Sequence, residues 1–256
     1  MSVYEIRDTK CLEKLFEGWQ ETLIWSCMQG CMGRAYADSI SNPKSAQIVI
    51  GDFCFFTGEA KKELVLNRPE DYKSNFIIMI PQNNEWSKLI EQTYKERATK
   101  VYRYAIKKER DVFDIEKLSK IVKEIKKPFS IQMIDNDIFN QVMSKSWSKD
   151  LCSQFNDYED YRKRGIGVVV IKDGIVVSGA SSYTVYNEGI EIEIDTRKDY
   201  RRKGLALACG AKLILECLNK GLYPSWDAQN KGSVALAEKL GYHFDKEYEA
   251  YEIMDY

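Results

Sequence analysis

The sequence predicts an α+β fold, with an α/β-type mixed sheet, and the second half of the chain predicts it most clearly. Residues 165–171 (GIGVVVI) are continuously apolar, as in a buried strand, and Asp173-Gly174 then gives a strong two-residue hairpin signal. Residues 190–194 (IEIEI) alternate strictly between apolar and acidic side chains, which is typical of a strand. Helix-like segments follow these strands, so we expect a mixed sheet with helices packed on it.

The other elements of the second half follow from local patterns. Residues 203–220 place apolar side chains on one stripe at helical spacing, and Gly221 follows as a stop signal. Asn230 is expected to cap a second helix that ends at Gly241 in the left-handed conformation. The elements expected here are strands at 129–134, 165–171, 175–186, 190–194, 222–228 and 242–256, and helices at 137–145, 149–163, 203–220 and 230–240.

The first half has weaker patterns. We expect helices at 9–32, 85–97 and 114–125, and strands at 46–56, 76–80 and 100–106. Pro128 follows the last of these helices, so two domains are predicted, 1–126 and 127–256. The segment 81–83 (PQN), with its following helix and strand, echoes 228–230 (AQN) with its own helix and strand. The first domain is therefore predicted to be an α/β domain and a degenerate copy of the second, with chance similarity as the alternative.

Composition restricts the function classes. The formal net charge of -1 gives no global field toward nucleic acid or a membrane, and we expect neither as a partner. The seven cysteines lack framework spacing and no leader or apolar span is evident, so we expect free thiols and a cytoplasmic location. His243 is the only histidine, which argues against Ser-His-Asp catalysis and multi-histidine metal sites, and no metal is expected.

The most informative segment is 195–206 (DTRKDYRRKGLA), which links a strand to a helix. Cations are unfavourable at a helix N-terminus, so their presence suggests a bound anion such as a phosphate or pyrophosphate. Gly204 has no Cβ, which lets a ligand oxygen approach its backbone N–H closely. Charge-assisted hydrogen bonds would come from Arg201, Arg202 and Lys203. The alternative is a basic surface turn before a helix.

In its context this loop resembles the GCN5-related N-acetyltransferase (GNAT) superfamily. The likeness covers about residues 129–256 and includes the second helix start, Asn230-Lys231-Gly232-Ser233. It implies a GNAT acyl-CoA acyltransferase fold in this half, with acetyl-CoA as co-substrate and an amine as acceptor. The whole-chain layout also looks like a two-domain subgroup that includes the self-resistance acetyltransferase for zwittermicin A, an aminopolyol, which suggests a small cationic acceptor.

The resemblance also implies a cofactor site. The strands at 190–195 and 222–228 would splay apart, and the pantetheine arm would pair in the gap with backbone near Ile194 and Thr196. Residues 201–206 would hold the pyrophosphate. Two polar residues at the next helix start match family positions and could equally be a cap. The predicted cofactor-binding residues are Ile194, Thr196, Arg201, Arg202, Lys203, Gly204, Leu205, Ala206, Asn230 and Ser233.

The sequence departs from the family at the general acid. Many members carry a tyrosine four residues before the helix-ending glycine, and here that position is Ala237. Tyr242, another tyrosine or water would then protonate the leaving thiolate, or the thiolate would leave unassisted.

The general base is sought on the alternating strand. An attacking amine must be neutral, so a carboxylate or a water chain should take its proton. Glu191, Glu193 and Asp195 share one face of that strand, and Glu193 is preferred as the base, with Glu191 second. Three carboxylates on a buried face would be costly unless they meet water or a cation, so this face also suggests a cationic acceptor. A solvated sheet face is the alternative.

Together these observations predict an N-acetyltransferase that moves acetyl directly from acetyl-CoA to a primary amine of a small cationic molecule. One alternative is a protein acetyltransferase that acts on lysine or an N-terminal amine. Another is a non-catalytic CoA-binding module, which the Ala237 substitution supports. A homodimer is left open.

Overall fold

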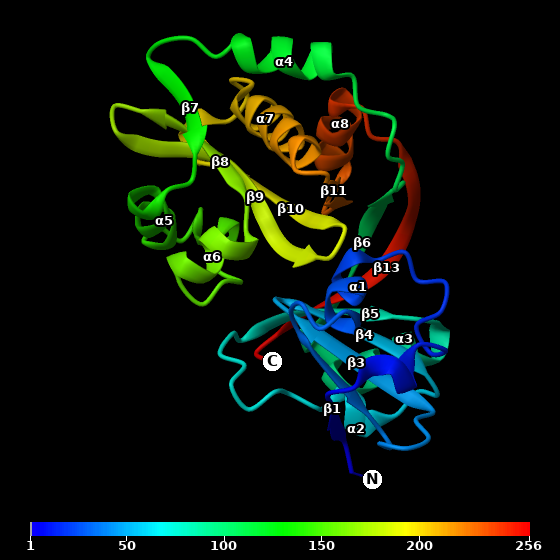
Figure 1. The fold of residues 1–256 in the computed structure, drawn as a ribbon. Helices are drawn as coiled ribbons and strands as arrows, with labels where there is room; N and C mark the ends of the chain where they lie inside the picture. Colours follow the sequence, from blue (N-terminus) through cyan, green and yellow to red (C-terminus); the bar gives the residue numbers. More distant parts are fainter. Residues whose placement is uncertain (1) are drawn as a thin grey trace. The chain divides into compact units, whose positions relative to one another are not determined.

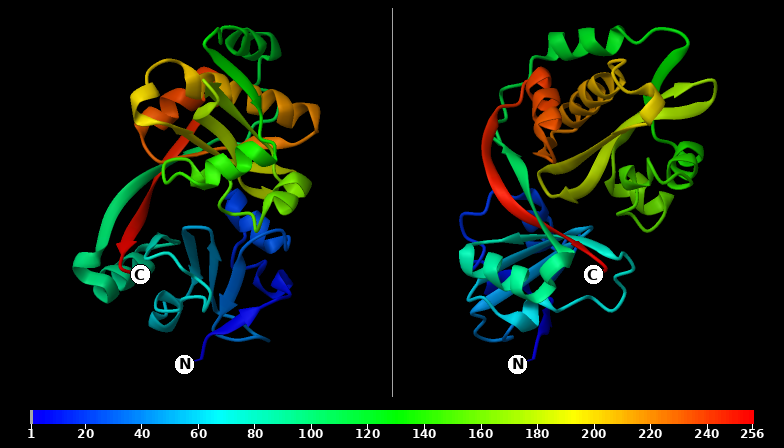
Figure 2. Two further views of the ribbon diagram at one scale, coloured as in Figure 1. Left: turned by 90° about the vertical axis from the view of Figure 1, so that its left-hand side faces the viewer. Right: turned by 180° about the vertical axis from the view of Figure 1, so that it is seen from behind.

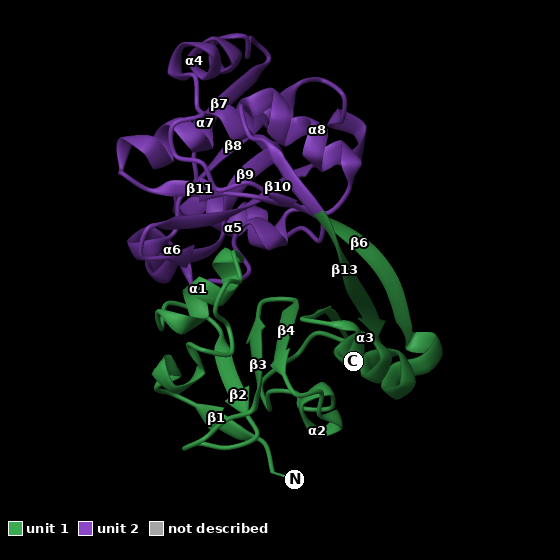
Figure 3. Ribbon diagram, turned by 90° about the vertical axis from the view of Figure 1, so that its right-hand side faces the viewer, with its two compact units in different colours: residues 1–103, 247–256 green, residues 104–246 purple. Residues whose placement is uncertain are grey.

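Two long strands, β6 (Ala98–Ile106) and β13 (Phe244–Met254), run through both structural units of the chain. The structure, a computed structural model, describes residues 2–256 (Figures 1 and 2). One unit contains the residues up to Arg103 together with Glu247–Tyr256, and the other is Tyr104–Lys246 (Figure 3). These units have other bounds than the two expected domains, 1–126 and 127–256. The domain boundary at 126/127 stays a prediction.

The second unit contains a five-stranded sheet in the order β11-β10-β9-β8-β7. Its strands are β7 (Phe129–Met133), β8 (Gly167–Lys172), β9 (Ile175–Tyr186), β10 (Gly189–Thr196) and β11 (Tyr223–Ser225). Only β10 and β11 are parallel within this sheet of the described chain; its other neighbouring pairs are antiparallel. Helices α5 (Asn136–Met143) and α6 (Tyr158–Arg164) lie on one face, and α4 (Ile115–Lys123), α7 (Leu205–Asn219) and α8 (Lys231–Leu240) lie on the other (Figures 1 and 2).

The first unit is built on most of an eight-stranded sheet, ordered β1-β2-β3-β4-β5-β13-β6-β12. The remaining strands are β1 (Tyr4–Ile6), β2 (Arg34–Ala37), β3 (Ser45–Ile50), β4 (Phe53–Gly58), β5 (Phe76–Pro81) and β12 (Asp227–Ala228). Its helices are α1 (Thr22–Met28), α2 (Lys62–Val65) and α3 (Asn84–Tyr94). Trp86 and Ile90 of α3 are fully buried against Phe56, Met79 and Tyr251, and these residues belong to the core of this unit.

The two halves share one strand order. In each, four strands pair antiparallel in sequence, and the fourth then pairs parallel with the fifth: β1 to β5 in the first half and β7 to β11 in the second. An asparagine caps the helix that follows in both cases, Asn83 for α3 and Asn230 for α8. This agreement supports the sequence echo, and a common origin of the halves stays a prediction.

The parallel pair differs between the halves. In the first half β4 pairs with β5 from Phe53 to Phe56. Beyond Phe56, side chains form hydrogen bonds with the backbone of β4. The Gly58 N–H donates to Gln82 Oε1 at 3.0 Å, and Trp86 Nε1 donates to the Gly58 carbonyl at 2.9 Å. We call Gln82 and Trp86 the plug, because they form hydrogen bonds with the backbone N–H and carbonyl of Gly58 at the end of β4.

The sequence prediction of the first half was wrong in two places. The helix expected at 9–32 is a short 3-10 helix (Thr9–Leu12) and α1, because Gly18 has φ of 83° and turns the chain between them. The strand expected at 46–56 is the hairpin β3–β4, turning at Gly51 with φ of 54°. Three elements were not expected at all, β1, β2 and α2.

Two expected elements of the second half also divide. The helix expected at 149–163 is a 3-10 helix, η3 (Lys149–Leu151), and α6, which Asp157 caps. The strand expected at 222–228 is β11 and β12, which belong to different sheets. The chain leaves the five-stranded sheet after Ser225 and pairs with β6 from Asp227.

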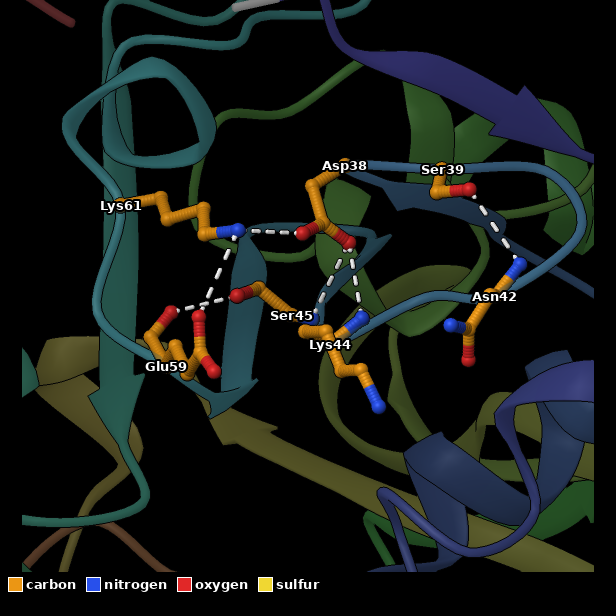
Figure 4. Close-up of polar contacts among 7 residues, drawn as sticks. All are labelled: Asp38, Ser39, Asn42, Lys44, Ser45, Glu59 and Lys61. Atoms are coloured by element: carbon orange, nitrogen blue, oxygen red, sulfur yellow. Dashed lines mark hydrogen bonds and ion pairs between the residues drawn. The ribbon is translucent and has the colours of Figure 1, made fainter.

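A network around Asp38 fixes the chain between β2 and β3 (Figure 4). The Asp38 carboxylate accepts hydrogen bonds from the backbone N–H of Lys44 at 2.9 Å and of Ser45 at 3.1 Å, and it pairs with Lys61 Nζ. Ser45 Oγ donates to the Glu59 carbonyl at 2.6 Å. Burial alone would raise the pKa of Asp38, but these hydrogen bonds together outweigh it and hold the pKa below its usual value.

We expect Asp38→Asn to destabilise the protein by about 1.5–3 kcal/mol at pH 7, the scale of hydrogen bonds to a charged group. A lowered folded-state pKa means that this contribution is present above about pH 4 and lost as the pH falls through the folded pKa. Urea unfolding at pH 7 measures the effect. Asp71→Asn is the control, because the Asp71–Arg34 pair is exposed and should contribute well under 1 kcal/mol. Equal losses for both variants would contradict the prediction.

No helix among residues 2–256 combines the length and the apolarity needed to cross a bilayer.

Candidate active site

The strands β10 and β11 separate partway along β10. They pair for three residues, Gly189–Glu191 with Tyr223–Ser225, and Glu191↔Ser225 is the last pair. β10 then continues to Thr196 with β9 on one side only. We call this separation the split. The splayed strands implied by the family resemblance are therefore present, and the split opens because the chain leaves this sheet after Ser225.

Two predicted cofactor contacts, Ile194 and Thr196, lie on the open edge of β10. The N–H of Arg197 donates to the Val177 carbonyl of β9 at 3.0 Å. Successive backbone N–H groups of a strand point to opposite edges, so the N–H groups of Thr196 and Ile194 point away from β9. This edge can accept an extended ligand in place of a strand.

The N-terminus of α7 follows shortly after the end of β10 in the sequence, and the described residues provide no side-chain cap for it. Its N-cap residue is Gly204, with φ of 76°, and the residues that the structure describes make no side-chain capping hydrogen bond there. Every other helix of eight or more residues between residues 2 and 256 is capped by an Asn or Asp side chain. A Cβ built on Gly204 would meet no atom within 4 Å. Open space, free N–H donors and the helix dipole together suit an anion.

The three cations before Gly204 are exposed. Arg201 Nε donates to the Thr196 carbonyl at 3.1 Å, which ties the loop to the end of β10. Arg202 has φ of 61°, and Lys203 Nζ lies 4.8 Å from the Tyr200 ring centroid. The two remaining loop residues predicted to bind cofactor, Leu205 and Ala206, begin α7, where Leu205 is buried and Ala206 is half-buried.

The predicted contacts Asn230 and Ser233 are engaged within the chain. Asn230 Oδ1 accepts from the Ser233 N–H at 3.0 Å and so caps α8. Ser233 Oγ accepts from Trp226 Nε1 at 3.1 Å. The capping alternative is therefore confirmed for Asn230, and a cofactor role for either residue stays a prediction.

The two candidate bases occupy different environments on β10. Glu191 is 5% exposed and stands at the closed end of the split, between Thr184 of β9 and Ser225 of β11. Glu193 is half-buried, pairs in register with Ser181 of β9, and lies beyond the last β10–β11 pair. The ladder shifts register between Glu191 and the next residue, which also marks this point in the sheet.

Tyr242 lies apart from the open edge. Its side chain is 2% exposed, its ring packs edge-on against Phe113 and Trp226, and its hydroxyl donates to the Pro224 carbonyl at 2.6 Å. Burial, more than any neighbouring charge, raises the pKa of this phenol well above 10. Its proton is already donated to a backbone carbonyl, so a role as general acid stays a prediction from sequence without geometric support.

Asp195 is the third carboxylate of the predicted acidic face of β10, and no role was predicted for it. Burial, and then the charge of Asp150, raise its pKa to about 6, although Arg201 and the Thr196 backbone N–H act in the opposite direction. Asp150 belongs to η3, which packs on β9 and β10. No local sequence signal could have brought these two carboxylates together.

We expect Asp195→Asn to raise the melting temperature at pH 8. A folded-state pKa of about 6, against about 3.9 in an unfolded chain, means that the stability contribution of Asp195 is full below pH 4 and lost as the pH rises through 6. Because the side chain is partly solvated, we expect about 1 kcal/mol, or about 2–4 °C. Thermal unfolding at pH 4 should show no difference between the two proteins. Equal melting temperatures at pH 8 would contradict the raised pKa.

Three comparisons place the chain among known proteins. The profile of the GNAT acetyltransferase family matches residues 13–251. A GCN5-related N-acetyltransferase-like protein from Streptococcus suis 89/1591 has a crystal structure that is 44% identical, covers 96% of this chain and 98% of its own, and superposes with a TM-score of 0.91. The uncharacterized N-acetyltransferase YdfB of Bacillus subtilis is 25% identical over 90% of this chain and 89% of its own. A GNAT-family acetyltransferase from Colwellia psychrerythraea shares the fold at a TM-score of 0.54 and 10% identity, covering 99% of this chain and 100% of its own.

The fold and the site define an acyltransferase of the GNAT type. The chain belongs to the GNAT acetyltransferase family, and the matched region includes both halves. The sequence-based fold class, mixed α+β with a GNAT fold, is confirmed, as is the assignment to the N-acetyltransferases.

Proposed function

We propose that this enzyme transfers an acetyl group from acetyl-CoA to a primary amine of a small cationic molecule. The observation that supports it most is the split beside the uncapped N-terminus of α7. An open strand edge and an anion-binding helix start, joined by a loop with three exposed cations, suit a donor that has an extended amide arm and a pyrophosphate.

The residues present fit this donor. The pyrophosphate would bind to the N–H groups from Gly204 to Ala206, with Arg201, Arg202 and Lys203 around it. The pantetheine amides would pair with the β10 edge at Ile194 and Thr196. When bound, acetyl-CoA supplies a thioester carbonyl that an amine can attack.

Glu191 is the stronger candidate for the base, which reverses the order that the sequence suggested. An extended arm that starts at the α7 end of β10 runs toward the closed end of the split, where Glu191 stands. In the reaction the C–N bond forms and the C–S bond breaks. The amine proton ends on the carboxylate, and the thiolate takes a proton from solvent. Glu193 and Asp195 follow on the same strand, and their charges favour a cationic acceptor.

Thiol release from acetyl-CoA with a panel of amines tests this proposal. The panel contains a diamine, an aminopolyol, a monoamine with no other charged group, and a lysine peptide. We expect the diamine or the aminopolyol to exceed the monoamine and the peptide at least tenfold in kcat/KM. A preference for the peptide would instead support a protein acetyltransferase. Tight acetyl-CoA binding without release by any amine would support a non-catalytic module.

A further inference from the structure

A row of polar side chains crosses three strands at the closed end of the split. Thr184 of β9 pairs in register with Glu191 of β10, and Glu191 pairs with Ser225 of β11. Residues paired in this way lie on one face of a sheet with neighbouring Cβ atoms about 4.5–5.5 Å apart. We call Thr184, Glu191 and Ser225 the polar row.

The two hydroxyls of the row have no partner among the described residues. Thr184 and Ser225 are both 0% exposed, and across residues 2–256 neither Thr184 Oγ1 nor Ser225 Oγ has a hydrogen-bond partner. Other buried hydroxyls of this unit are bonded: Ser148 Oγ donates to the Val142 carbonyl at 2.9 Å, and Ser182 Oγ accepts from the Ile166 N–H at 3.0 Å. Burying a hydroxyl without a hydrogen-bond partner is unfavourable, so two of them beside one carboxylate need a physical reason.

The spacing of the row suits a bridging molecule. Two hydrogen bonds of about 2.8 Å through one oxygen span the separation between adjacent side chains of a sheet. A buried water needs two to four polar partners, and the row offers two hydroxyls and a carboxylate.

We propose that Thr184 and Ser225 hold an ordered water against the Glu191 carboxylate, and that this water carries the proton from the acceptor amine to Glu191. The inference rests on the proposed function, because it needs Glu191 as the base. Thr184 and Ser225 are positioning residues: they act through the water. The hydroxyls give the water a fixed orientation at the end of the split where the pairing of β10 and β11 stops.

Other titratable groups surround Glu191. Tyr186 of β9, Tyr223 of β11 and Tyr242 after α8 lie close enough for the Glu191 charge to raise the pKa of each phenol, although burial is the larger cause for all three. The charges of Glu188 and Arg110 also act on Tyr186, and the charge of Glu109 acts on Tyr223. A pH profile of activity therefore reflects the titration of Glu191 together with these neighbours. Variants of the polar row must for this reason keep Tyr186, Tyr223 and Tyr242 unchanged.

The test compares Thr184→Val and Ser225→Ala with Thr184→Ser, which keeps the hydroxyl. We expect Thr184→Val and Ser225→Ala each to lower kcat about tenfold, with the KM for acetyl-CoA unchanged within twofold. Loss of hydrogen bonds to the carboxylate should also move the acid limb of the kcat/KM profile to higher pH. Thr184→Ser should keep the wild-type rate and profile.

Ser148→Ala is the control for a buried serine whose loss is only structural; it should lower the melting temperature without moving the pH profile. Wild-type kcat and profile in both Thr184→Val and Ser225→Ala would overturn the inference. Glu191→Gln tests the base assignment separately from the proposed water. If Glu191→Gln is inactive while the hydroxyl variants are normal, only the water fails; if Glu191→Gln is fully active, the base assignment itself fails.

Discussion

Gly204→Asp should weaken acetyl-CoA binding by roughly 100-fold or more while the fold is kept. The substitution places a carboxylate at the N-cap of α7, where it would cap the free N–H groups itself and repel a pyrophosphate. Aspartate tolerates the left-handed backbone at this position better than most residues, and no atom lies within 4 Å of the new Cβ, so the structure should accommodate it. Calorimetric titration with acetyl-CoA measures the change.

Gly174→Asp is a matched control for that experiment. Gly174 also has φ of 76° and also has no atom within 4 Å of a built Cβ, but it lies in the β8–β9 hairpin turn. The two variants therefore add the same charge at the same positive φ. Binding as tight in Gly204→Asp as in Gly174→Asp would remove the assignment of the α7 N-terminus to the phosphates.

Glu191→Gln should lower kcat by about 10²–10⁴-fold, the usual range for a lost general base, with acetyl-CoA affinity unchanged. The amide keeps the shape of the side chain at the closed end of the split but cannot take a proton there. Steady-state kinetics with the best acceptor of the panel gives kcat, and calorimetry gives the donor affinity.

Glu193→Gln is the companion variant, on the same strand and two residues away. It lies beyond the last β10–β11 pair and is half-buried, so we expect less than a tenfold loss of kcat, together with a higher KM for a cationic acceptor. The reverse outcome, a large loss in Glu193→Gln and a small one in Glu191→Gln, would restore the order of the bases that the sequence suggested.

The features that the sequence predicted well are local. The hairpin at Asp173-Gly174, the helix ending at Gly241 and the glycine at the start of α7 depend on residues within one turn of each other. The phosphate-binding prediction is of this kind, because it needs only a strand, a cationic loop and a helix in succession. Patterns failed where one glycine changed the chain direction inside a segment expected to be a single element, as at Gly18 and Gly51.

The features that the sequence could not predict depend on distant pairing. The closed end of the split is set by where β11 leaves its sheet, and periodicity alone does not show that the segment 222–228 contributes strands to two sheets. The polar row joins residues from three strands, and only the register places Thr184 and Ser225 beside Glu191. The environment of Asp195 likewise depends on Asp150, 45 positions earlier by residue number.

The plug in the first half has a kinetic consequence. Because Gln82 and Trp86 already bond to Gly58, the end of β4 does not offer an unpaired edge like that of β10. We therefore expect one donor equivalent per polypeptide, a calorimetric stoichiometry of about one, and simple hyperbolic saturation by acetyl-CoA. A stoichiometry of two would mean that Trp86 moves away from Gly58. The enzyme would then have a second acetyl-CoA site, through which the donor concentration would regulate the first site.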